Sequence, residues 1–144
     1  MAERDWYPKL RKYLEKHDYV CHSYWKKSKK KYEKLDFIDV GLGNIRIDVF
    51  GIKRISDRSS NFQLETVGVE VKDRTRVTLR DIRQAASYSN LCTRGYLAAP
   101  VKEFTETDKK HAAELGIGLI RLKNPFQVAV ESKRNGIDID LVNQ

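Results

Sequence analysis

The 144-residue chain has only two cysteines, three prolines and one methionine. Cys21 and Cys92 are too few and too far apart for a disulfide framework or a four-thiolate zinc site, and we expect both to be small buried residues. No apolar run approaches the roughly 18–20 residues needed to cross a bilayer, and no apolar stretch follows the charged N-terminus as in a signal peptide. We therefore expect a reduced, intracellular protein, cytoplasmic or nucleoid-associated, that does not bind membranes.

Familiar catalytic and phosphate-binding motifs are also missing. The three histidines (His17, His22 and His111) have no metal-ligand spacing, and there is no HExxH segment, Walker A motif or GxGxxG loop. The Gly-Leu-Gly-Asn segment at residues 41–44 is typical of a tight turn rather than of a phosphate loop. These absences argue against a zinc protease and against P-loop nucleotide binding.

Positive charge is what the chain has in excess. Lysine and arginine number 28 against 20 aspartates and glutamates, which gives a net charge of +8. A small basic domain often binds a polyanion, usually nucleic acid, although a lysine-rich solvated surface would have the same composition. Hydrophobic residues make up 40% of the chain. That share and the length predict one domain with one core over residues 1–144.

Hydrophobic periodicity predicts alternating helices and strands. Helices are expected over residues 5–17, from Thr78 to about residue 90, and from Thr105 to residues 115–116. Strands are expected over residues 19–25, 35–40, 45–50, 62–72, 95–99, 117–122, 126–130 and 137–142. The last two flank an Asn-Gly pair, which is a strong hairpin signal, and the basic run at 26–31 is expected to be a loop or flexible arm. This order predicts an α/β fold, a mixed β-sheet flanked by helices, with a C-terminal hairpin.

The candidate chemistry lies in Asp48, Glu70 and Lys72. Side chains at i and i+2 share one face of a strand, so Glu70 and Lys72 should point the same way. If the strands at 45–50 and 62–72 pair, Asp48 joins them on that face, at the end of a sheet. The alternative is that the three residues form only the solvated face of the sheet.

Two carboxylates and an ammonium group in this pattern suit metal-assisted hydrolysis of a phosphodiester. Mg²⁺ prefers oxygen ligands, which Asp48 and Glu70 can supply, together with the backbone carbonyl of Val71. The bound metal acidifies water and offsets charge on the phosphate. Lys72 can orient the attacking water or neutralise charge on the scissile group.

Ile47-Asp48 followed by Glu70-Val71-Lys72 resembles the PD-(D/E)xK nuclease superfamily, with isoleucine in place of the usual proline. The resemblance covers residues 2–122 and implies a restriction-endonuclease-like core with the element order αβββαβ. It also implies a Mg²⁺-dependent DNA endonuclease, with Mn²⁺ able to substitute, that acts as a homodimer or higher homo-oligomer. We expect the final hairpin, residues 126–142, to mediate self-association; the alternative is that it merely extends the sheet.

The helix after the Glu-x-Lys strand carries a second match. Gln84 and Tyr88 form a Gln-x-x-x-Tyr pattern that resembles the accessory motif of RecB-like members and is compatible with Holliday-junction-resolvase-like ones. Residues i and i+4 share one face of a helix. The resemblance implies that both residues support the substrate or Lys72. Tyr88 considered alone is more typical of a core or boundary tyrosine, and its spacing after Glu70-x-Lys72 is what favours the site.

Many members of the superfamily carry an additional acid on the first helix. Glu3 is the candidate that we assign to this role. Glu15 is a second candidate and Glu33 a weaker third, and each is also compatible with an ordinary solvated position.

Two groups of basic residues are expected to bind DNA phosphates, because Lys and Arg supply most backbone contacts. They are Lys26, Lys27, Lys29, Lys30 and Lys31, and then Arg74, Arg76, Arg80 and Arg83. For the arginines the alternative is a charged surface in which Asp73 and Asp81 pair with them. For the whole chain the alternative is a non-catalytic basic DNA-binding module, or an assembly subunit, that retains the nuclease fold.

Overall fold

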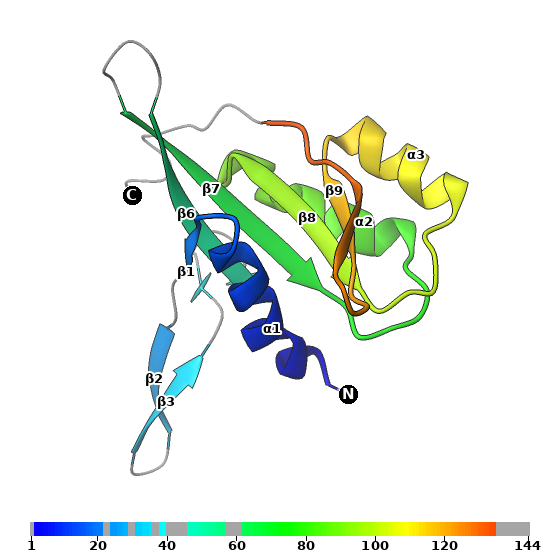
Figure 1. Ribbon diagram of the computed structural model, residues 1–144. Coiled ribbons are helices and arrows are strands. Elements are labelled where there is room, and N and C mark those ends of the chain that lie inside the picture. The colour runs from blue at the N-terminus through cyan, green and yellow to red at the C-terminus, as the bar shows by residue number, and fades with distance from the viewer. Residues whose placement is uncertain are drawn as a thin grey trace.

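The computed structural model in Figure 1 describes residues 2–21, 24–28, 31–35, 38–39, 46–56 and 62–134. Its centre is a mixed six-stranded sheet in the order β1-β6-β7-β8-β9-β10. Strands β7, β8 and β9 run parallel, whereas β1, β6 and β10 each run antiparallel to a neighbour. The predicted α/β class, a mixed sheet flanked by helices, is confirmed.

The large sheet consists of β1 (Val20–Cys21), β6 (Val49–Ser56), β7 (Phe62–Val71), β8 (Arg94–Ala99), β9 (Gly118–Arg121) and β10 (Gln127–Val130). Two short pairs lie outside it, β2 (Tyr24–Ser28) with β3 (Lys31–Leu35) and β4 (Ile38–Asp39) with β5 (Arg46–Ile47). The helices are α1 (Glu3–Glu15), α2 (Leu79–Ala86) and α3 (Glu106–Leu115), and a 3-10 turn, η1 (Ser87–Asn90), continues α2. None of the helices in these described segments is long and apolar enough to cross a membrane.

Cap residues explain where the helices begin and end. The Thr78 and Thr105 hydroxyls accept hydrogen bonds from the N–H groups of Asp81 and Asp108, as predicted. Helix α3 ends at Gly116, whose φ of 74° is readily adopted only without a β-carbon. Helix α1 begins two residues earlier than predicted and encloses Pro8 beyond its first turn.

Several expectations for the first half of the chain are wrong. The expected strand at 19–25 is two strands, β1 in the large sheet and β2 in a separate ribbon with β3. The basic run at 26–31 is not a loop, because its described residues belong to β2 and β3. The register places Lys26 opposite Glu33, and opposite charges across a ribbon favour pairing. Of the expected strand at 35–40, Leu35 ends β3 and residues 38–39 form β4, while the other positions lie outside the described residues.

The second half agrees more closely with the sequence-based expectations. Strand β10 pairs with β9, whereas the expected Asn-Gly turn at 135–136 and the strand at 137–142 lie outside the described residues. The helix expected to reach residue 90 does so only as a 3-10 turn in its last part.

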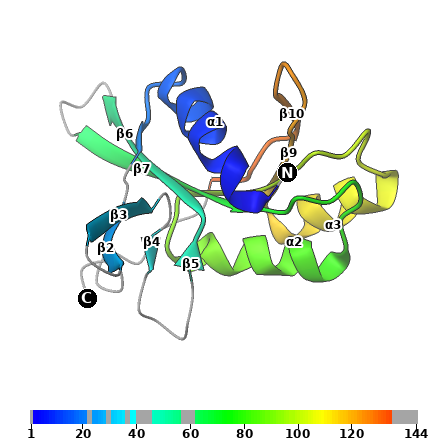
Figure 2. The same ribbon diagram turned by 90° about the horizontal axis from the view of Figure 1, so that it is seen from below.

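Both faces of the sheet are covered. Figure 2 shows α1 on one face and α2 with α3 on the other. Along β8, Tyr96 and Ala98 join the core cluster under α1, whereas Leu97 and Ala99 join the cluster under α2 and α3. This arrangement explains why the sequence of β8 is apolar without alternation. Cys92 is fully buried as expected, whereas Cys21 is only partly buried.

Candidate functional site

A bend at Asp48 separates β5 from β6 and brings a carboxylate to the end of the sheet. The Asp48 residue is only 2% exposed. Its Oδ2 accepts a hydrogen bond of 2.9 Å from the backbone N–H of Val71, and its Oδ1 lies 3.4 Å from the Arg46 guanidinium. Asp48 is therefore fixed against the last residue of β7 and is not part of a solvated face.

The same bend interrupts the alternation that a continuous strand over residues 45–50 would have. Ile47 and Val49 do not point the same way: Ile47 packs with Tyr88, whereas Val49 packs in the cluster under α1. A strand alternates with period two only while its ladder is continuous, and the ladder is interrupted at Asp48. Beyond the bend, β6 and β7 pair as predicted, with Val49 opposite Val69.

Glu70 and Lys72 come from the end of β7 and share one face, as predicted. Lys72 Nζ lies 3.4 Å from Glu70 Oε1, while the side chain of Val71 between them packs on the opposite face under α1. Glu70 is 3% exposed. Burial, and next the charge of Asp48, raise the pKa of Glu70 to about 7, although Tyr88 and Lys72 act in the opposite direction.

The hydroxyl group of Tyr88 lies between two acceptors. It is in hydrogen-bonding contact with Glu70 and is 2.9 Å from the Arg46 carbonyl oxygen. A phenol has one proton to donate. A proton donated to Glu70 stabilises its carboxylate and acts against the raised pKa, whereas a proton donated to the Arg46 carbonyl gives Glu70 no such stabilisation. The raised pKa of Glu70 therefore comes from burial and from the charge of Asp48, not from Tyr88.

Tyr7 on α1 is a site residue that the sequence-based predictions missed. Burial, and then the charge of Asp48 and a hydrogen bond to it, raise the pKa of the Tyr7 hydroxyl. The signal in the sequence that could have identified Tyr7 is its phenol on the buried face of α1, where the other buried residues are Leu10 and Leu14. Glu3 acts electrostatically on Tyr7; among the described residues it forms no metal-holding group of three with Asp48 and Glu70.

Gln84 and Tyr88 do not share one environment. Gln84 is exposed on α2, and its side chain makes no hydrogen bond with any described residue, whereas Tyr88 is 1% exposed. The expectation of a common face assumed an α-helical turn between them. The chain tightens into a 3-10 turn after Ala86, and three residues per turn rotate Tyr88 away from that face.

The four arginines expected to bind DNA are exposed: Arg74, Arg76, Arg80 and Arg83. Arg74 pairs with the buried carboxylate of Asp81, which also accepts the N–H of Thr78. The alternative in which an aspartate pairs with an arginine is therefore correct for Arg74. Asp73 instead accepts a hydrogen bond from the Trp6 indole. Arg76, Arg80 and Arg83 form no ion pair with the described part of the chain. The structure does not describe the lysine side chains of residues 26–31.

The donor set of this site fits a hard divalent cation. Asp48 and Glu70 are two buried carboxylates close enough for one to raise the pKa of the other, and the backbone of Val71 adjoins Asp48. Across the described residues, no three His, Cys, Asp or Glu side chains are grouped to hold a metal. A cation such as Mg²⁺ is commonly held by one or two carboxylates, with water and substrate oxygens completing the shell.

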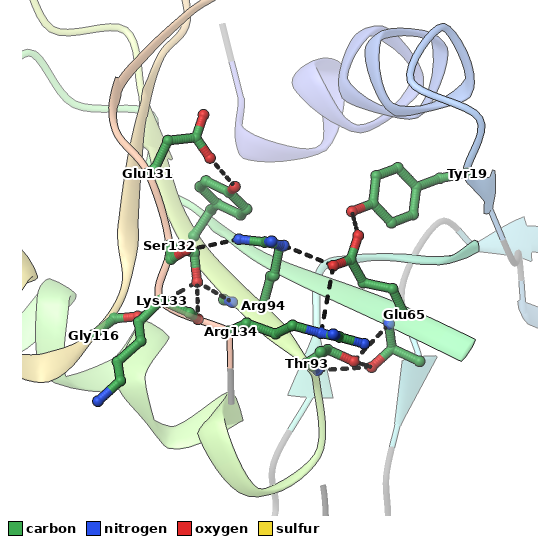
Figure 3. A network of polar contacts seen from close by, with 12 residues as sticks. Tyr19, Glu65, Thr93, Arg94, Gly116, Glu131, Ser132, Lys133 and Arg134 are labelled. Atoms are coloured by element: carbon green, nitrogen blue, oxygen red, sulfur yellow. Dashed lines mark hydrogen bonds and ion pairs between the residues drawn. The ribbon is translucent and has the colours of Figure 1, made fainter. Parts of the chain in front are cut away.

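A second buried glutamate on β7 provides a contrast. Glu65 faces α1 and accepts hydrogen bonds from Tyr19 at 2.7 Å and from Arg94 at 2.8 Å (Figure 3). Arg94 also donates to the Ser132 carbonyl oxygen at 2.8 Å. Burial alone would raise the pKa of Glu65, but the hydrogen bonds from Tyr19 and Arg94 overcome it and the pKa is lowered. The partners of Glu65 compensate its charge, which makes it a structural acid, whereas the partners of Glu70 compensate its charge incompletely.

Comparisons of the chain with protein-family models, with curated proteins and with solved structures found no match.

Proposed function

We propose that this chain is a Mg²⁺-dependent endonuclease that hydrolyses phosphodiester bonds in DNA. The observation that carries the proposal is the pair of buried carboxylates, Asp48 and Glu70, with Lys72 beside them at the end of the sheet. Burying two neighbouring carboxylates is unfavourable unless cations compensate them. The raised pKa of Glu70 indicates that its protein partners compensate it incompletely, as is common at functional sites.

The roles of the site residues follow from their contacts. Asp48, Glu70 and the carbonyl oxygen of Val71 would hold the metal, with Mn²⁺ as a substitute for Mg²⁺. The bound metal supplies Lewis acidity toward phosphate and water. Lys72 positions the attacking water or neutralises charge at the phosphate. Tyr88 orients Glu70, while Tyr7 and the Val71 N–H orient Asp48.

A restriction-endonuclease-like core of the PD-(D/E)xK type is part of the proposal. The order of α1, the antiparallel pair β6–β7, α2 and the parallel strand β8 supports it. The exposed Arg76, Arg80 and Arg83 follow Lys72 in the chain and are suited to DNA phosphates. The β2–β3 ribbon includes residues of the lysine run at 26–31, which we propose as a further contact with the DNA backbone.

The metal requirement gives the primary test. We expect Mg²⁺ and Mn²⁺ to support cleavage of a panel of single-stranded, duplex and branched DNAs. Ca²⁺ should permit DNA binding with little turnover, because its longer bonds and looser geometry position water less well. Gel assays of EDTA-treated protein, with each metal added back, check this. Full cleavage by the metal-free protein would contradict the proposal, and metal-independent DNA binding without cleavage would favour the non-catalytic module.

Tyr88→Phe tests the orientation of Glu70 by Tyr88 separately from metal binding by Glu70. The substitution keeps the packed ring but leaves the Arg46 carbonyl without its donor and Glu70 without one partner. Loss of such hydrogen bonds costs about 0.5–3 kcal/mol, so single-turnover cleavage should slow by about twofold to a hundredfold. Mn²⁺ affinity should change little. Gln84→Ala is the companion variant: a wild-type rate there would remove Gln84 from the proposed site.

Self-association completes the proposal, because cutting both strands of a duplex requires two active sites. Among the described residues β10 lies at one edge of the large sheet and β1 at the other, and an edge strand offers unpaired backbone groups for pairing. Light scattering of the full chain should therefore give the mass of a homodimer or a higher homo-oligomer.

A further inference from the structure

Residues of α1 and of the turn that joins β9 to β10 line an open groove. Figure 2 shows these two segments on the face of the sheet opposite α2 and α3. Its volume of about 590 Å³ is in the range of ligand sites. The lining combines three aromatic rings with four lysines and contains no acidic side chain. The residues used below are Trp6, Tyr13, Phe126, Lys9, Lys12 and Lys16.

The aromatic rings form a connected wall. The Phe126 ring centre is 6.1 Å from that of Trp6 and 5.7 Å from that of Tyr13, with both pairs tilted. All three side chains are partly buried against the core cluster under α1, and part of each side chain remains accessible. Lys9 Nζ lies 5.1 Å from the Trp6 ring centre, which adds a cation to the wall. Such rings are suited to stacking with planar groups.

The lysines form a row beside this wall. Lys9, Lys12 and Lys16 are spaced at i, i+3 and i+7 along α1, which places them on one side of the helix over about 10 Å. A positively charged groove with aromatic rings along it is how proteins bind unpaired nucleic-acid strands. An acidic peptide would use only the charge. A duplex keeps its base faces within its own stack and would use only the charge as well.

The groove is connected to the candidate site. Trp6 Nε1 donates a hydrogen bond of 3.1 Å to Asp73 Oδ1, and Asp73 directly follows Lys72. The next residue of α1, Tyr7, is hydrogen-bonded to Asp48. We propose that the groove binds an unpaired nucleic-acid strand beside the catalytic centre, so that the substrate is DNA with a single-stranded segment. The cleavage part of this inference rests on the proposed function, whereas strand binding requires no metal.

Fluorescence anisotropy of the full chain in EDTA tests strand binding without cleavage, with a short oligothymidine and a duplex of equal length as probes. Phe126→Ala should weaken oligothymidine binding by about tenfold, as expected for loss of one stacked base, and should weaken duplex binding by less than about twofold. Phe126→Leu retains apolar volume without a ring and should give the same loss, which keeps the test valid if the alanine variant does not fold. Lys110→Gln, on α3 at the opposite face, is the matched control.

Charge is tested separately by replacing Lys9, Lys12 and Lys16 together with glutamine. Each lost phosphate contact lowers the log–log salt slope by about 0.7 for single strands, so the slope should fall by about 2. Unchanged oligothymidine binding in Phe126→Leu and in the triple variant, with Mg²⁺-dependent cleavage intact, would overturn the groove assignment but not the nuclease. The predicted binding losses without cleavage of any DNA would instead overturn the proposed function and leave the strand site standing.

Discussion

Glu70→Gln is expected to abolish metal-dependent DNA cleavage and, at the same time, to stabilise the metal-free protein at pH 8. A metal ion supplies several kcal/mol of transition-state stabilisation, so removal of a ligand should lower the cleavage rate by about 10³-fold or more. The gain in stability has a separate cause. Glutamine is isosteric with glutamate but carries no charge, so the repulsion from Asp48 and the unfavourable burial of an anion disappear.

The pH dependence of this effect has a defined sign. In the folded state the pKa of Glu70 is raised to about 7 from an ordinary value of 4.5. The folded state therefore binds the proton more tightly than the unfolded state. The resulting stability is fully present below pH 4.5 and is lost as pH rises through 7. The loss by pH 8 is on the order of 3 kcal/mol.

Urea unfolding of wild type and Glu70→Gln at pH 5 and pH 8, without metal, measures this difference. The variant should exceed wild type in unfolding free energy at pH 8 and approach it at pH 5. A variant that cleaves DNA at the wild-type rate would remove Glu70 from the site. A variant less stable than wild type at pH 8 would show that Glu70 is a structural acid.

Glu65→Gln is expected to have the opposite effect on stability. Glu65 accepts hydrogen bonds from Tyr19 and Arg94 (Figure 3). It precedes Glu70 by an odd number of positions in β7, so the two side chains lie on opposite faces of the strand. The Arg94 side chain is 28% exposed and glutamine keeps one acceptor oxygen, so the expected cost is that of weakened hydrogen bonds to a charged group, about 1.5–3 kcal/mol. That is a large share of the roughly 5–15 kcal/mol of a typical domain.

The pKa of Glu65 is lowered in the folded state, so its contribution is present above the ordinary carboxyl pKa and is lost as pH falls. Wild type should therefore exceed Glu65→Gln most at neutral pH, and the difference should shrink in acid. The folded fraction of the variant should cleave DNA at the wild-type rate. Loss of cleavage with unchanged stability would reverse the roles assigned to the two glutamates.

The alternation in β7 made part of the site predictable from the sequence. The two-residue period of a strand places Glu70 and Lys72 on one face and Val71 on the other, because this period does not depend on contacts with distant residues. Helix caps are similarly local, and Thr78 and Thr105 mark two helix starts correctly. Pairing of β6 with β7 then brings Asp48 beside Glu70.

Features set by tertiary contacts were not predictable in this way. The bend at Asp48 separates Ile47 from Val49, and no local signal in the sequence marks it. Tyr7 reaches Asp48 only because α1 packs on one face of the sheet. The 3-10 turn after Ala86 buries Tyr88 and leaves Gln84 exposed, although the spacing of the two residues suggested a shared helix face.

The most direct test of the central claim, that Asp48 and Glu70 hold a divalent cation, needs no substrate. Thermal unfolding at pH 8 with increasing Mn²⁺ compares wild type, Glu70→Gln and the structural control Glu65→Gln. Binding to the folded state at a hundred times Kd contributes about 2.7 kcal/mol, so the Tm of wild type should rise by about 5–10 °C. Glu65→Gln should start from a lower Tm and show the same rise, and Glu70→Gln should start higher and show none. An equal Mn²⁺-dependent rise in Glu70→Gln would contradict the claim, as would no rise in wild type.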